Sequence, residues 1–286
     1  MKSRKQFEVL SWASLFLEEH NCEKPIAEIL LQHHLNVTRS EFYMTMQEPI
    51  SETIVNKFKA DIEKHVQTGI PVQHLLGYEM FYGRKFTVNE NTLIPRPETE
   101  ELVQHVIELS KSRFTKQPLT ILDIGTGSGV IAITLALEIP NAIVYATDIS
   151  KKALQIAEEN ARQQQAKVTF LQGDFLQPII DKDIKADMIV SNPPYIAKSD
   201  EACLSRTVKN FDPNLALFAE ENGLAAYKQI LELSTKVMEQ DGIIAFEIGY
   251  EQGITVSSLI KECYPQSNVD LIQDINGMDR IVSTQL

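Results

Sequence analysis

Cysteine is scarce in this sequence of 286 residues. Only three cysteines are present, Cys22, Cys203 and Cys263, and they lie far apart along the chain. An odd number of widely spaced cysteines provides neither a disulfide framework nor the ligand spacing of a metal site. We therefore expect a protein without a bound metal that works in a reducing compartment, the cytoplasm.

Long apolar runs are also missing. A helix that crosses a bilayer needs about 20 consecutive apolar residues, and no such run occurs here. The basic amino-terminal residues resemble the start of a secretory signal, but Glu8 interrupts the apolar stretch and no small-residue cleavage site follows. Phe7, Leu10 and Leu17 instead fit one face of an amphipathic helix, so we expect no membrane association.

Positive charge is in deficit as well. Lys and Arg number 27 against 39 Asp and Glu, which gives a formal net charge of -12 and a pI near 5.0. Such a surface repels polyanions, so non-specific attraction to nucleic acid is not expected to supply the main binding energy. We predict no direct nucleic-acid partner.

The sequence changes in character along its length. Residues 1–77 show helical periodicity in several short segments, with a helix start at Ser51 and a stop at Gly69. Residues 78–95 alternate apolar and polar side chains around a glycine, which is typical of a β-hairpin. The helices expected in the first part span residues 6–20, 26–35, 40–46 and 51–69.

Residues 96–286 alternate strand-like apolar runs with amphipathic helical segments. This alternation predicts an α/β fold, a Rossmann-like sheet that is doubly wound and mainly parallel. Ligands bind such sheets at the carboxyl ends of the strands. We expect helices over 97–113, 129–139, 151–164 and 224–239, strands over 119–125, 142–149, 167–174, 186–194 and 242–249, and a final strand pair at 268–275 and 279–284.

A glycine-rich stretch, LDIGTGSGVI, follows the first of these strands. Asp123 ends the strand, and Gly125, Gly127 and Gly129 occupy the turn into the next helix, where glycine lets the backbone approach a ligand. The dinucleotide-binding fingerprint requires its third glycine one position later, where Val130 stands. The spacing therefore disfavours a pyrophosphate cofactor.

Acidic residues follow the next two strands. Asp148 stands where a carboxylate grips a ribose diol, and Asp174 with Phe175 offers a carboxylate and an apolar ring suited to an adenine. Each of these residues alone also fits a helix cap or an ordinary turn. Together and in this order, they resemble the cofactor motifs of the class I S-adenosylmethionine-dependent methyltransferases.

The segment SNPPYI follows the fourth strand and faces the same crevice. An amide or exocyclic amine nitrogen is a poor nucleophile because its lone pair is delocalised, so acceptors must orient its N–H groups. The Asn192 side-chain oxygen provides one acceptor, and the Pro193 carbonyl, whose direction Pro194 restricts, provides another. Tyr195 can stack on a planar substrate group. Alternatively, the Pro-Pro pair merely ends the strand.

Histidine is absent from most of the chain. All six histidines lie at or before His105, so we expect none in the sheet domain. A histidine general base, a Ser-His-Asp triad and a histidine metal site are thereby excluded there. The absence of histidine agrees with a reaction that depends on positioning of the substrate nitrogen and needs no strong base.

Asn-Pro-Pro-Tyr segments occur in enzymes that methylate glutamine side chains and in enzymes that methylate amino groups of nucleic-acid bases. The stretch PVQHLLGYEMFYGRKFTVNENTLIPRPETEELV, residues 71–103, resembles the junction segment of the peptide chain release factor glutamine methyltransferase family. The resemblance continues in LDIGTGSGVIAI, NGLAAYKQIL, FEIGYEQG and DINGMDRIV, and so covers essentially the whole chain. It implies a helical domain, a connecting hairpin and a class I methyltransferase domain over 1–77, 78–95 and 96–286.

The resemblance also implies roles for individual residues. S-adenosyl-L-methionine would be the methyl donor, S-adenosyl-L-homocysteine the product, and the glutamine of a Gly-Gly-Gln loop in bacterial release factors the substrate. The helical domain would either grip this partner or shield the sheet. Phe175 replaces a tryptophan common in relatives, and residues 207–224 match the family pattern loosely. Catalytic roles are implied for Asn192, Pro193 and Tyr195, substrate contacts for these and Pro194, and cofactor contacts for Gly125, Thr126, Gly127, Ser128, Gly129, Asp148, Asp174, Phe175 and Asn192.

Three alternatives stay open. A ribosomal-protein glutamine methyltransferase continues differently after IPR, so Pro97, Glu98 and Glu100 favour the release-factor family. A nucleic-acid amino-methyltransferase needs a basic channel, which neither the net charge of -12 nor the residues near 192–220 supply. A cofactor-binding module without catalysis would not require the intact Asn-Pro-Pro-Tyr segment.

Overall fold

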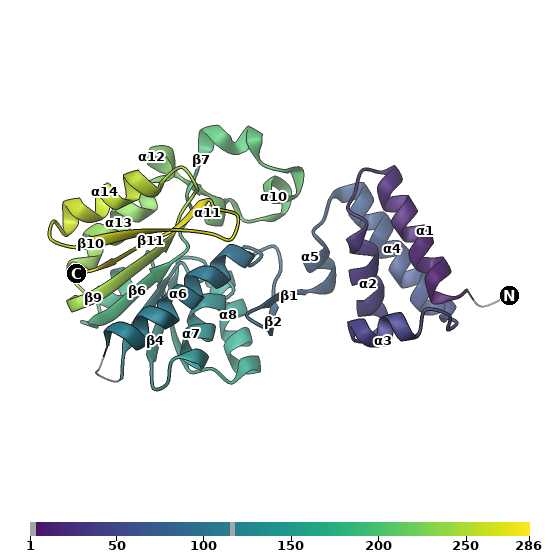
Figure 1. The fold of residues 1–286 in the computed structure, drawn as a ribbon, viewed down its shortest axis with the longest axis horizontal. Helices are drawn as coiled ribbons and strands as arrows, with labels where there is room; N and C mark the ends of the chain where they lie inside the picture. The colour runs from purple at the N-terminus through teal and green to yellow at the C-terminus, as the bar shows by residue number, and fades with distance from the viewer. Residues whose placement is uncertain (1–3, 115–117) are drawn as a thin grey trace. The chain divides into compact units, whose positions relative to one another are not determined.

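The computed structural model describes residues 4–114 and 118–286 of the chain (Figure 1). Contacts group these residues into two compact units. The first comprises Met1–Gly77 together with Ser205–Phe211, and the second comprises Tyr78–Leu204 and Asp212–Leu286. Within the described ranges, no helix is both long and apolar enough to pass through a bilayer.

The first unit is helical, and the four helices expected over residues 1–77 are present. The Ser51 side chain accepts a hydrogen bond from the Ile54 N–H, and Gly69 ends the same helix with a φ of 74°, which confirms both expected boundaries. Two further short helices were not expected, α5 and α10. The helices are α1 (Gln6–Glu19), α2 (Pro25–Leu35), α3 (Arg39–Met44), α4 (Glu52–Thr68), α5 (Val72–Leu76) and α10 (Arg206–Phe211).

The buried face of α1 differs from the expected one. Val9, Ala13 and Leu17 are buried in the core of this unit, whereas Phe7 is 38% exposed. The prediction that Phe7 marks the inner face was therefore wrong. The inner face includes Gln6 instead, because its Nε2 donates a buried hydrogen bond to the Phe42 carbonyl at 2.7 Å, a contact that an apolar pattern does not reveal.

The second unit begins with the expected hairpin. Strand β1 (Tyr78–Phe81) pairs antiparallel with β2 (Arg84–Thr87). Tyr82 and Gly83 make the turn with φ values of 51° and 72°, and positive φ at both central residues matches the twist of a two-residue hairpin. The ladder ends at Thr87, so residues 88–95 form an irregular segment that leads to α6.

A seven-stranded sheet with the order β10-β11-β9-β6-β3-β4-β5 forms the centre of the second unit. Strands β9, β6, β3, β4 and β5 run parallel to one another, and β11 pairs antiparallel with both of its neighbours, β9 and β10. This mainly parallel sheet confirms the expected fold class. The strands are β3 (Thr120–Ile124), β4 (Ile143–Asp148), β5 (Val168–Gln172), β6 (Ala186–Ser191), β9 (Met238–Glu247), β10 (Asn268–Gln273) and β11 (Asp279–Gln285).

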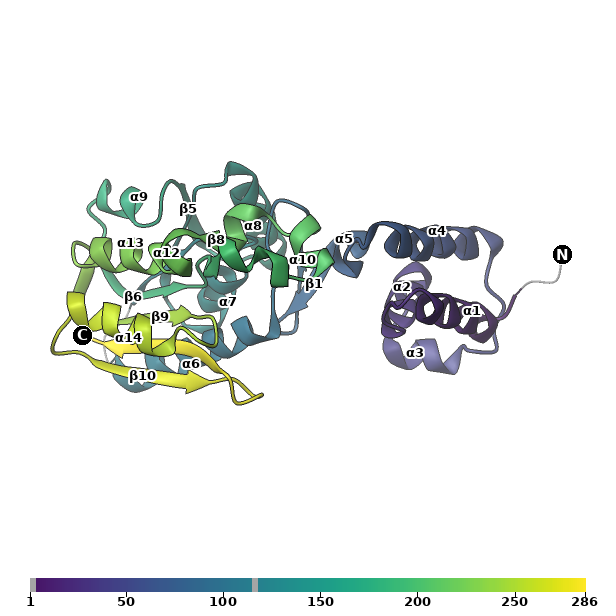
Figure 2. The ribbon, with the colours of Figure 1, turned by 90° about the horizontal axis from the view of Figure 1, so that it is seen from above.

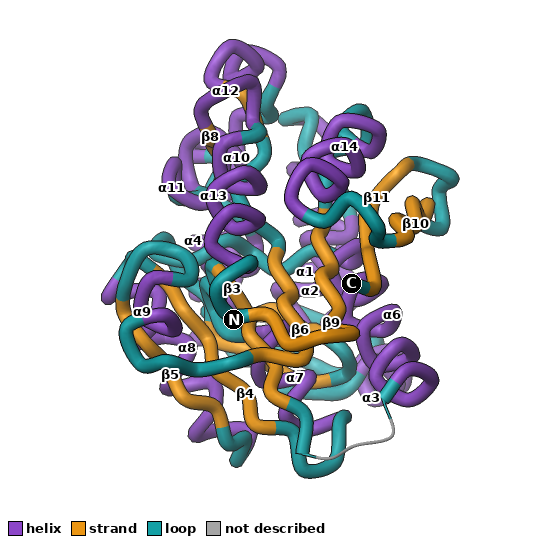
Figure 3. The backbone as a smooth tube through the Cα atoms, turned by 90° about the vertical axis from the view of Figure 1, so that its left-hand side faces the viewer, coloured by secondary structure: helices purple, strands orange, loops and turns teal. Residues whose placement is uncertain are grey.

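Helices cover both faces of this sheet (Figures 2 and 3). Side chains alternate across each strand, so Ile121 belongs to one hydrophobic core and Leu122 to the other. The first core includes residues of α6 (Pro97–Arg113), α7 (Val130–Glu138) and α8 (Lys151–Gln164). The second includes residues of α9 (Gln177–Ile180), α13 (Ala225–Ser234) and α14 (Gly253–Cys263).

The expected helix over 224–239 was only partly right. Helix α13 ends at Ser234, and β9 already begins at Met238, which pairs with Ala186 of β6. Pairing with a distant strand decides this boundary, and it overrides the local helical pattern. Helix α14 and several short elements were not expected; the latter are α9, β7 (Ile196–Ala197), η1 (Lys198–Cys203), α11 (Asn214–Leu217), β8 (Phe218–Ala219) and α12 (Glu220–Gly223).

Candidate active site

A cavity of ≈ 310 Å³ opens in the second unit where the parallel strands end. The carboxyl ends of parallel strands meet at one edge of a sheet, and the turns that follow them leave a crevice there. Strand ends, the segment before α6 and the segment before α13 all contribute to the wall. The lining residues are Asn91, Thr92, Leu93, Pro95, Arg96, Thr99, Gly125, Thr126, Gly127, Ser128, Val130, Ile131, Asp148, Ile149, Ser150, Ala153, Asp174, Phe175, Asn192, Pro194, Pro213, Leu215, Ala216, Phe218, Ala219, Ala225, Ala226 and Gln229.

The glycine-rich loop after β3 is fixed by hydrogen bonds to the protein interior. The N–H groups of Gly125 and Thr126 both donate to the Thr147 carbonyl at 2.9 Å. Thr126 Oγ1 and the Ala132 N–H donate to Asp123 Oδ2 at 2.6 Å and 3.0 Å. Asp123 is fully buried, and burial raises the pKa of its carboxyl group to about 7. Asp123 therefore holds the loop from inside the protein.

Gly125 and Gly127 leave room for a ligand at this loop. Both line the cavity, and a Cβ built on either would meet no described protein atom within 4 Å. Gly129 differs, because its Cβ would lie 2.9 Å from Ile133 Cδ1 and 3.0 Å from Ala157 Cβ. Gly129 thus lets α7 and α8 pack closely, and it is not among the lining residues of the described chain.

Replacing Gly127 by alanine is expected to weaken cofactor binding with little loss of stability. The new methyl group would enter the cavity, so the Kd for S-adenosyl-L-homocysteine, measured by calorimetry, should rise at least about tenfold. The positive φ of 57° should lower the free energy of unfolding by about 1 kcal/mol. Gly69→Ala is the matched control, since Gly69 has a φ of 74° and open space around it. An unchanged Kd would show that no ligand approaches Gly127.

Asp148 ends β4 and lines the cavity. Its Oδ2 accepts the Gly127 N–H at 2.9 Å, and its Oδ1 accepts the Ser150 N–H at 2.8 Å. Burial raises the pKa of this carboxyl group, while the two hydrogen bonds act in the opposite direction. Each oxygen has a further lone pair, so Asp148 can accept ligand hydroxyl groups while it holds the glycine loop.

Asp174 and Phe175 follow β5, and both line the cavity. Asp174 Oδ2 accepts a hydrogen bond from Gln229 Nε2 of α13 at 2.7 Å. Phe175 has a φ of 41°, which is uncommon for a residue other than glycine, and its side chain packs against the second hydrophobic core. Gln229 also lines the cavity, although nothing in the helical pattern of its segment distinguishes it.

The segment after β6 contributes only some of its residues to the lining. Asn192 and Pro194 line the cavity, whereas Pro193 and Tyr195 are not among the lining residues of the described chain. Gln252 Nε2 donates to the Tyr195 carbonyl at 3.0 Å and anchors the segment. Burial raises the pKa of Tyr195 to about 12, so its phenol stays protonated at neutral pH and does not serve as a base.

The Asn192 carboxamide is held by α6. Its Nδ2 donates to Thr99 Oγ1 at 3.2 Å, and Thr99 Oγ1 donates to Glu247 Oε2 at 2.6 Å. Glu247 ends β9 and is 2% exposed, and burial raises the pKa of its carboxyl group to about 7. Thr99 and Glu247 lie within two of the resembling motifs, but the sequence contains no sign that these motifs meet.

Two further segments complete the wall. One precedes α6 and includes Arg96, and the other, around α11, includes Leu215. Arg96 Nη2 lies 2.9 Å from Asp212 Oδ2, and this ion pair joins the two segments. Leu215 is 58% exposed, so it gives the cavity an apolar rim.

His105 corrects one expectation. It belongs to α6 of the second unit, so the prediction that the sheet domain contains no histidine was wrong. Its Nε2 lies 2.9 Å from Ser283 Oγ of β11, and burial lowers the pKa of its imidazole. His105 packs α6 on the sheet, and it is not one of the described residues that line the cavity.

The fold and the cavity together define a class I S-adenosylmethionine-dependent methyltransferase. The catalytic domain of hMettl16, solved in complex with a MAT2A 3′UTR hairpin, has a TM-score of 0.53 over 82% of this chain and 81% of its own. At 16% sequence identity, this likeness shows the fold alone. Residues 101–216 match the family model of the methyltransferase small domain, and residues 8–77 match that of the PrmC N-terminal domain.

Curated relatives align over almost the full length. The release factor glutamine methyltransferase of Bacillus cereus is 45% identical over 280 residues, which cover 98% of this chain and 99% of the relative. That of Bacillus subtilis is 46% identical over 277 residues, which cover 96% of each chain. This chain belongs to the release factor glutamine methyltransferase family.

Proposed function

We propose that this chain transfers a methyl group from S-adenosyl-L-methionine to the side-chain amide nitrogen of the glutamine in the Gly-Gly-Gln loop of bacterial release factors. One observation carries the proposal. Asn192 lines the cavity with its Nδ2 bonded to Thr99, which leaves its Oδ1 to accept an amide N–H. The names of the curated relatives support the same substrate.

The cavity residues fit S-adenosyl-L-methionine. Gly125 and Gly127 present backbone without side chains, Asp148 can accept the ribose hydroxyl groups, and Phe175 offers a ring to the adenine face. The bound cofactor would supply a methyl group on a positively charged sulfur, which is open to attack by a nucleophile. Thr126, Ser128, Asp174 and Asn192 also line the cavity and are the further expected cofactor contacts.

The glutamine nitrogen must be oriented because its lone pair is delocalised into the amide carbonyl. Asn192 Oδ1 and the Pro193 carbonyl would accept its two N–H groups, and Pro194 restricts the direction of that carbonyl. Such alignment can contribute about 7–11 kcal/mol to lowering the barrier. Gln252 anchors the segment through the Tyr195 carbonyl. Stacking of Tyr195 on the substrate stays a prediction.

The partner would be the release factor itself. A glycine-flanked loop can enter a narrow cavity without side-chain clashes, and a net charge of -12 suits a partner with a basic, RNA-facing surface. In this proposal residues 1–77 recognise the rest of the release factor, residues 78–95 connect, and residues 96–286 form the methyltransferase domain. The reaction takes place in the cytoplasm, where translation occurs.

The proposal is tested with cofactor that carries a labelled methyl group. The protein is incubated with a release factor, either wild type or with Gln→Ala in its Gly-Gly-Gln loop, and we expect label on the wild-type factor alone. Label on both factors, or on neither, would refute the proposal. Label in ribosomal or transfer RNA in place of the factor would favour an amino-methyltransferase of nucleic acid.

A further inference from the structure

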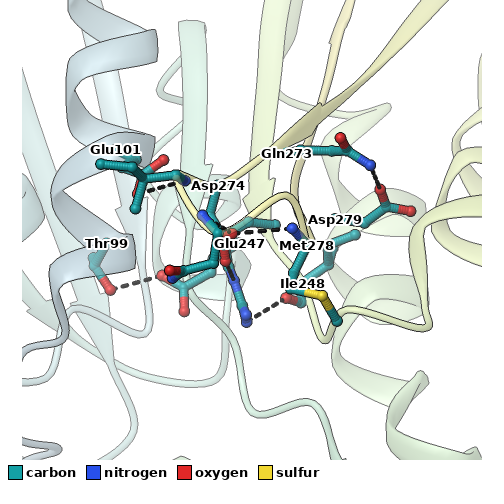
Figure 4. Close-up of polar contacts among 11 residues, drawn as sticks. Thr99, Glu101, Glu247, Ile248, Gln273, Asp274, Met278 and Asp279 are labelled. Atoms are coloured by element: carbon teal, nitrogen blue, oxygen red, sulfur yellow. Dashed lines mark hydrogen bonds and ion pairs between the residues drawn. The ribbon is translucent and has the colours of Figure 1, made fainter.

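Two motifs without an assigned role meet beside Asn192. Thr99 comes from IPRPETEELV on α6, and Glu247 comes from FEIGYEQG at the end of β9. The parallel pairing of β6 with β9 places Asn192 and Glu247 at the ends of neighbouring strands. Figure 4 shows Thr99 reaching from α6 to Glu247, next to the turn between β10 and β11.

The number of available protons determines the hydrogen-bond directions. An ionised carboxylate only accepts, so Thr99 donates its single hydroxyl proton to Glu247 Oε2 at 2.6 Å. The Thr99 oxygen then has no proton left to donate to Asn192. It can only accept a hydrogen bond, and it accepts one from an Asn192 N–H at 3.2 Å. Asn192 must therefore present Nδ2 to Thr99 and turn its Oδ1 the other way.

We propose that Glu247 is a positioning residue that, through Thr99, fixes the Asn192 carboxamide with its acceptor oxygen toward the substrate amide. This inference rests on the proposed function. With the carboxamide reversed, Asn192 N–H groups would face the N–H groups of the glutamine, and Asn192 would no longer supply an acceptor to orient the nitrogen. Glu247 thus acts on Asn192 as a buried carboxylate acts on the histidine that it orients.

The surroundings of Glu247 favour this role. Glu247 and Thr99 are 2% and 3% exposed, so water does not compete for their hydrogen bond. Burial raises the pKa of Glu247 to about 7, while the hydrogen bonds from Thr99 and Asn192 and the charge of Arg280 act in the opposite direction. The charged or titratable groups that face Glu247 are Glu98 on α6, Tyr195 after β6, Tyr227 on α13 and Arg280 on β11.

Protonation of Glu247 would remove the constraint. A protonated carboxyl group can donate to Thr99 Oγ1, and Thr99 can then donate to Asn192 Oδ1, which permits the reversed carboxamide. The ionised form of Glu247 is therefore the one that supports methyl transfer. Because its pKa lies at about 7, the rate should be full above this pH and should fall as the pH drops below it.

Single-turnover rates with saturating cofactor and release factor test the inference. Thr99→Val keeps the shape of the side chain and removes the hydroxyl group, so we expect a rate about 10- to 100-fold lower. Thr99→Ser keeps the hydroxyl group and should stay within about threefold of wild type. Thr134→Val is the matched control, because Thr134 is fully buried in α7 and is not among the lining residues of the described chain.

Two further measurements separate positioning from a loss of structure. Glu247→Gln should reduce the fall in rate below about pH 7 to the part that protonation of Asp123 causes, whereas Glu98→Gln, which changes a nearby charge and keeps the Thr99 bond, should retain the full fall. In NMR spectra of the cofactor-free protein, the Asn192 Nδ2 protons should exchange with solvent faster in Thr99→Val than in wild type.

The outcomes distinguish this inference from the proposed function. A wild-type rate in Thr99→Val would overturn the route through Thr99, and a fall at acidic pH that is undiminished in Glu247→Gln would overturn the role of Glu247. A wild-type protein that does not methylate the release factor would overturn the proposed function instead. In that case the exchange of the Asn192 Nδ2 protons still decides whether Thr99 holds the carboxamide.

Discussion

We expect Asn192→Ala to lower the rate of methyl transfer about 100- to 1,000-fold. The change removes the Oδ1 acceptor that would orient the glutamine nitrogen, while Asp148 still holds the glycine loop through Gly127. The Kd for S-adenosyl-L-homocysteine, measured by calorimetry, should therefore rise less than about tenfold. A single turnover with labelled cofactor and a release factor measures the rate.

Two variants make this result specific. Asn192→Asp keeps the shape of the side chain but cannot donate to Thr99, and it places a second carboxylate near Glu247, so we expect a comparable loss. Asn276→Ala shortens an exposed asparagine between β10 and β11 and should change neither rate nor Kd. If Asn192→Ala lost cofactor affinity as strongly as rate, Asn192 would be primarily a cofactor residue.

Gly223→Ala should lower the free energy of unfolding by about 3 kcal/mol or more, measured by urea denaturation. Gly223 has a φ of 84°, and a Cβ there would lie 2.1 Å from the Tyr195 carbonyl oxygen and 2.8 Å from its carbonyl carbon. These are backbone atoms, and Gln252 holds the same oxygen at 3.0 Å, so they cannot shift cheaply. The displaced segment carries Asn192, so methyl transfer should fall as well.

Gly277→Ala separates the two causes of this loss. Gly277 has a φ of 77°, but no described atom lies within 4 Å of a Cβ built there. Only the backbone strain then applies, and we expect a loss of about 1 kcal/mol. Equal losses in Gly223→Ala and Gly277→Ala would show that the close approach of Gly223 to Tyr195 does not contribute.

Predictions from the sequence succeeded where a residue's position depends on its neighbours in the chain. The glycine loop, Asp148 and Asn192 each come at or just after the end of an apolar strand, and the ends of parallel strands meet at one edge. Their place at one cavity therefore followed from the alternation of strands and helices. The cap at Ser51 and the stop at Gly69 are equally local.

Predictions failed where packing with a distant segment decides. Gln6 occupies the inner face of α1 because the Phe42 carbonyl accepts its hydrogen bond there. Met238 joins β9 because Ala186 of β6 pairs with it. In each case the partner residue lies in a different element, and the periodicity of the local sequence does not identify that partner.

The sequence by itself determined the fold class, the sheet edge that carries the cavity and the resemblance to the family. Only the tertiary structure decided that Glu247 and Thr99 hold Asn192. Thr99 lies 93 residues from Asn192 and 148 from Glu247 along the chain. A hydrogen bond of 2.6 Å between such distant residues requires α6 and β9 to be placed to within a fraction of an ångström. The close packing of the whole core sets that placement, and no single segment of sequence encodes it.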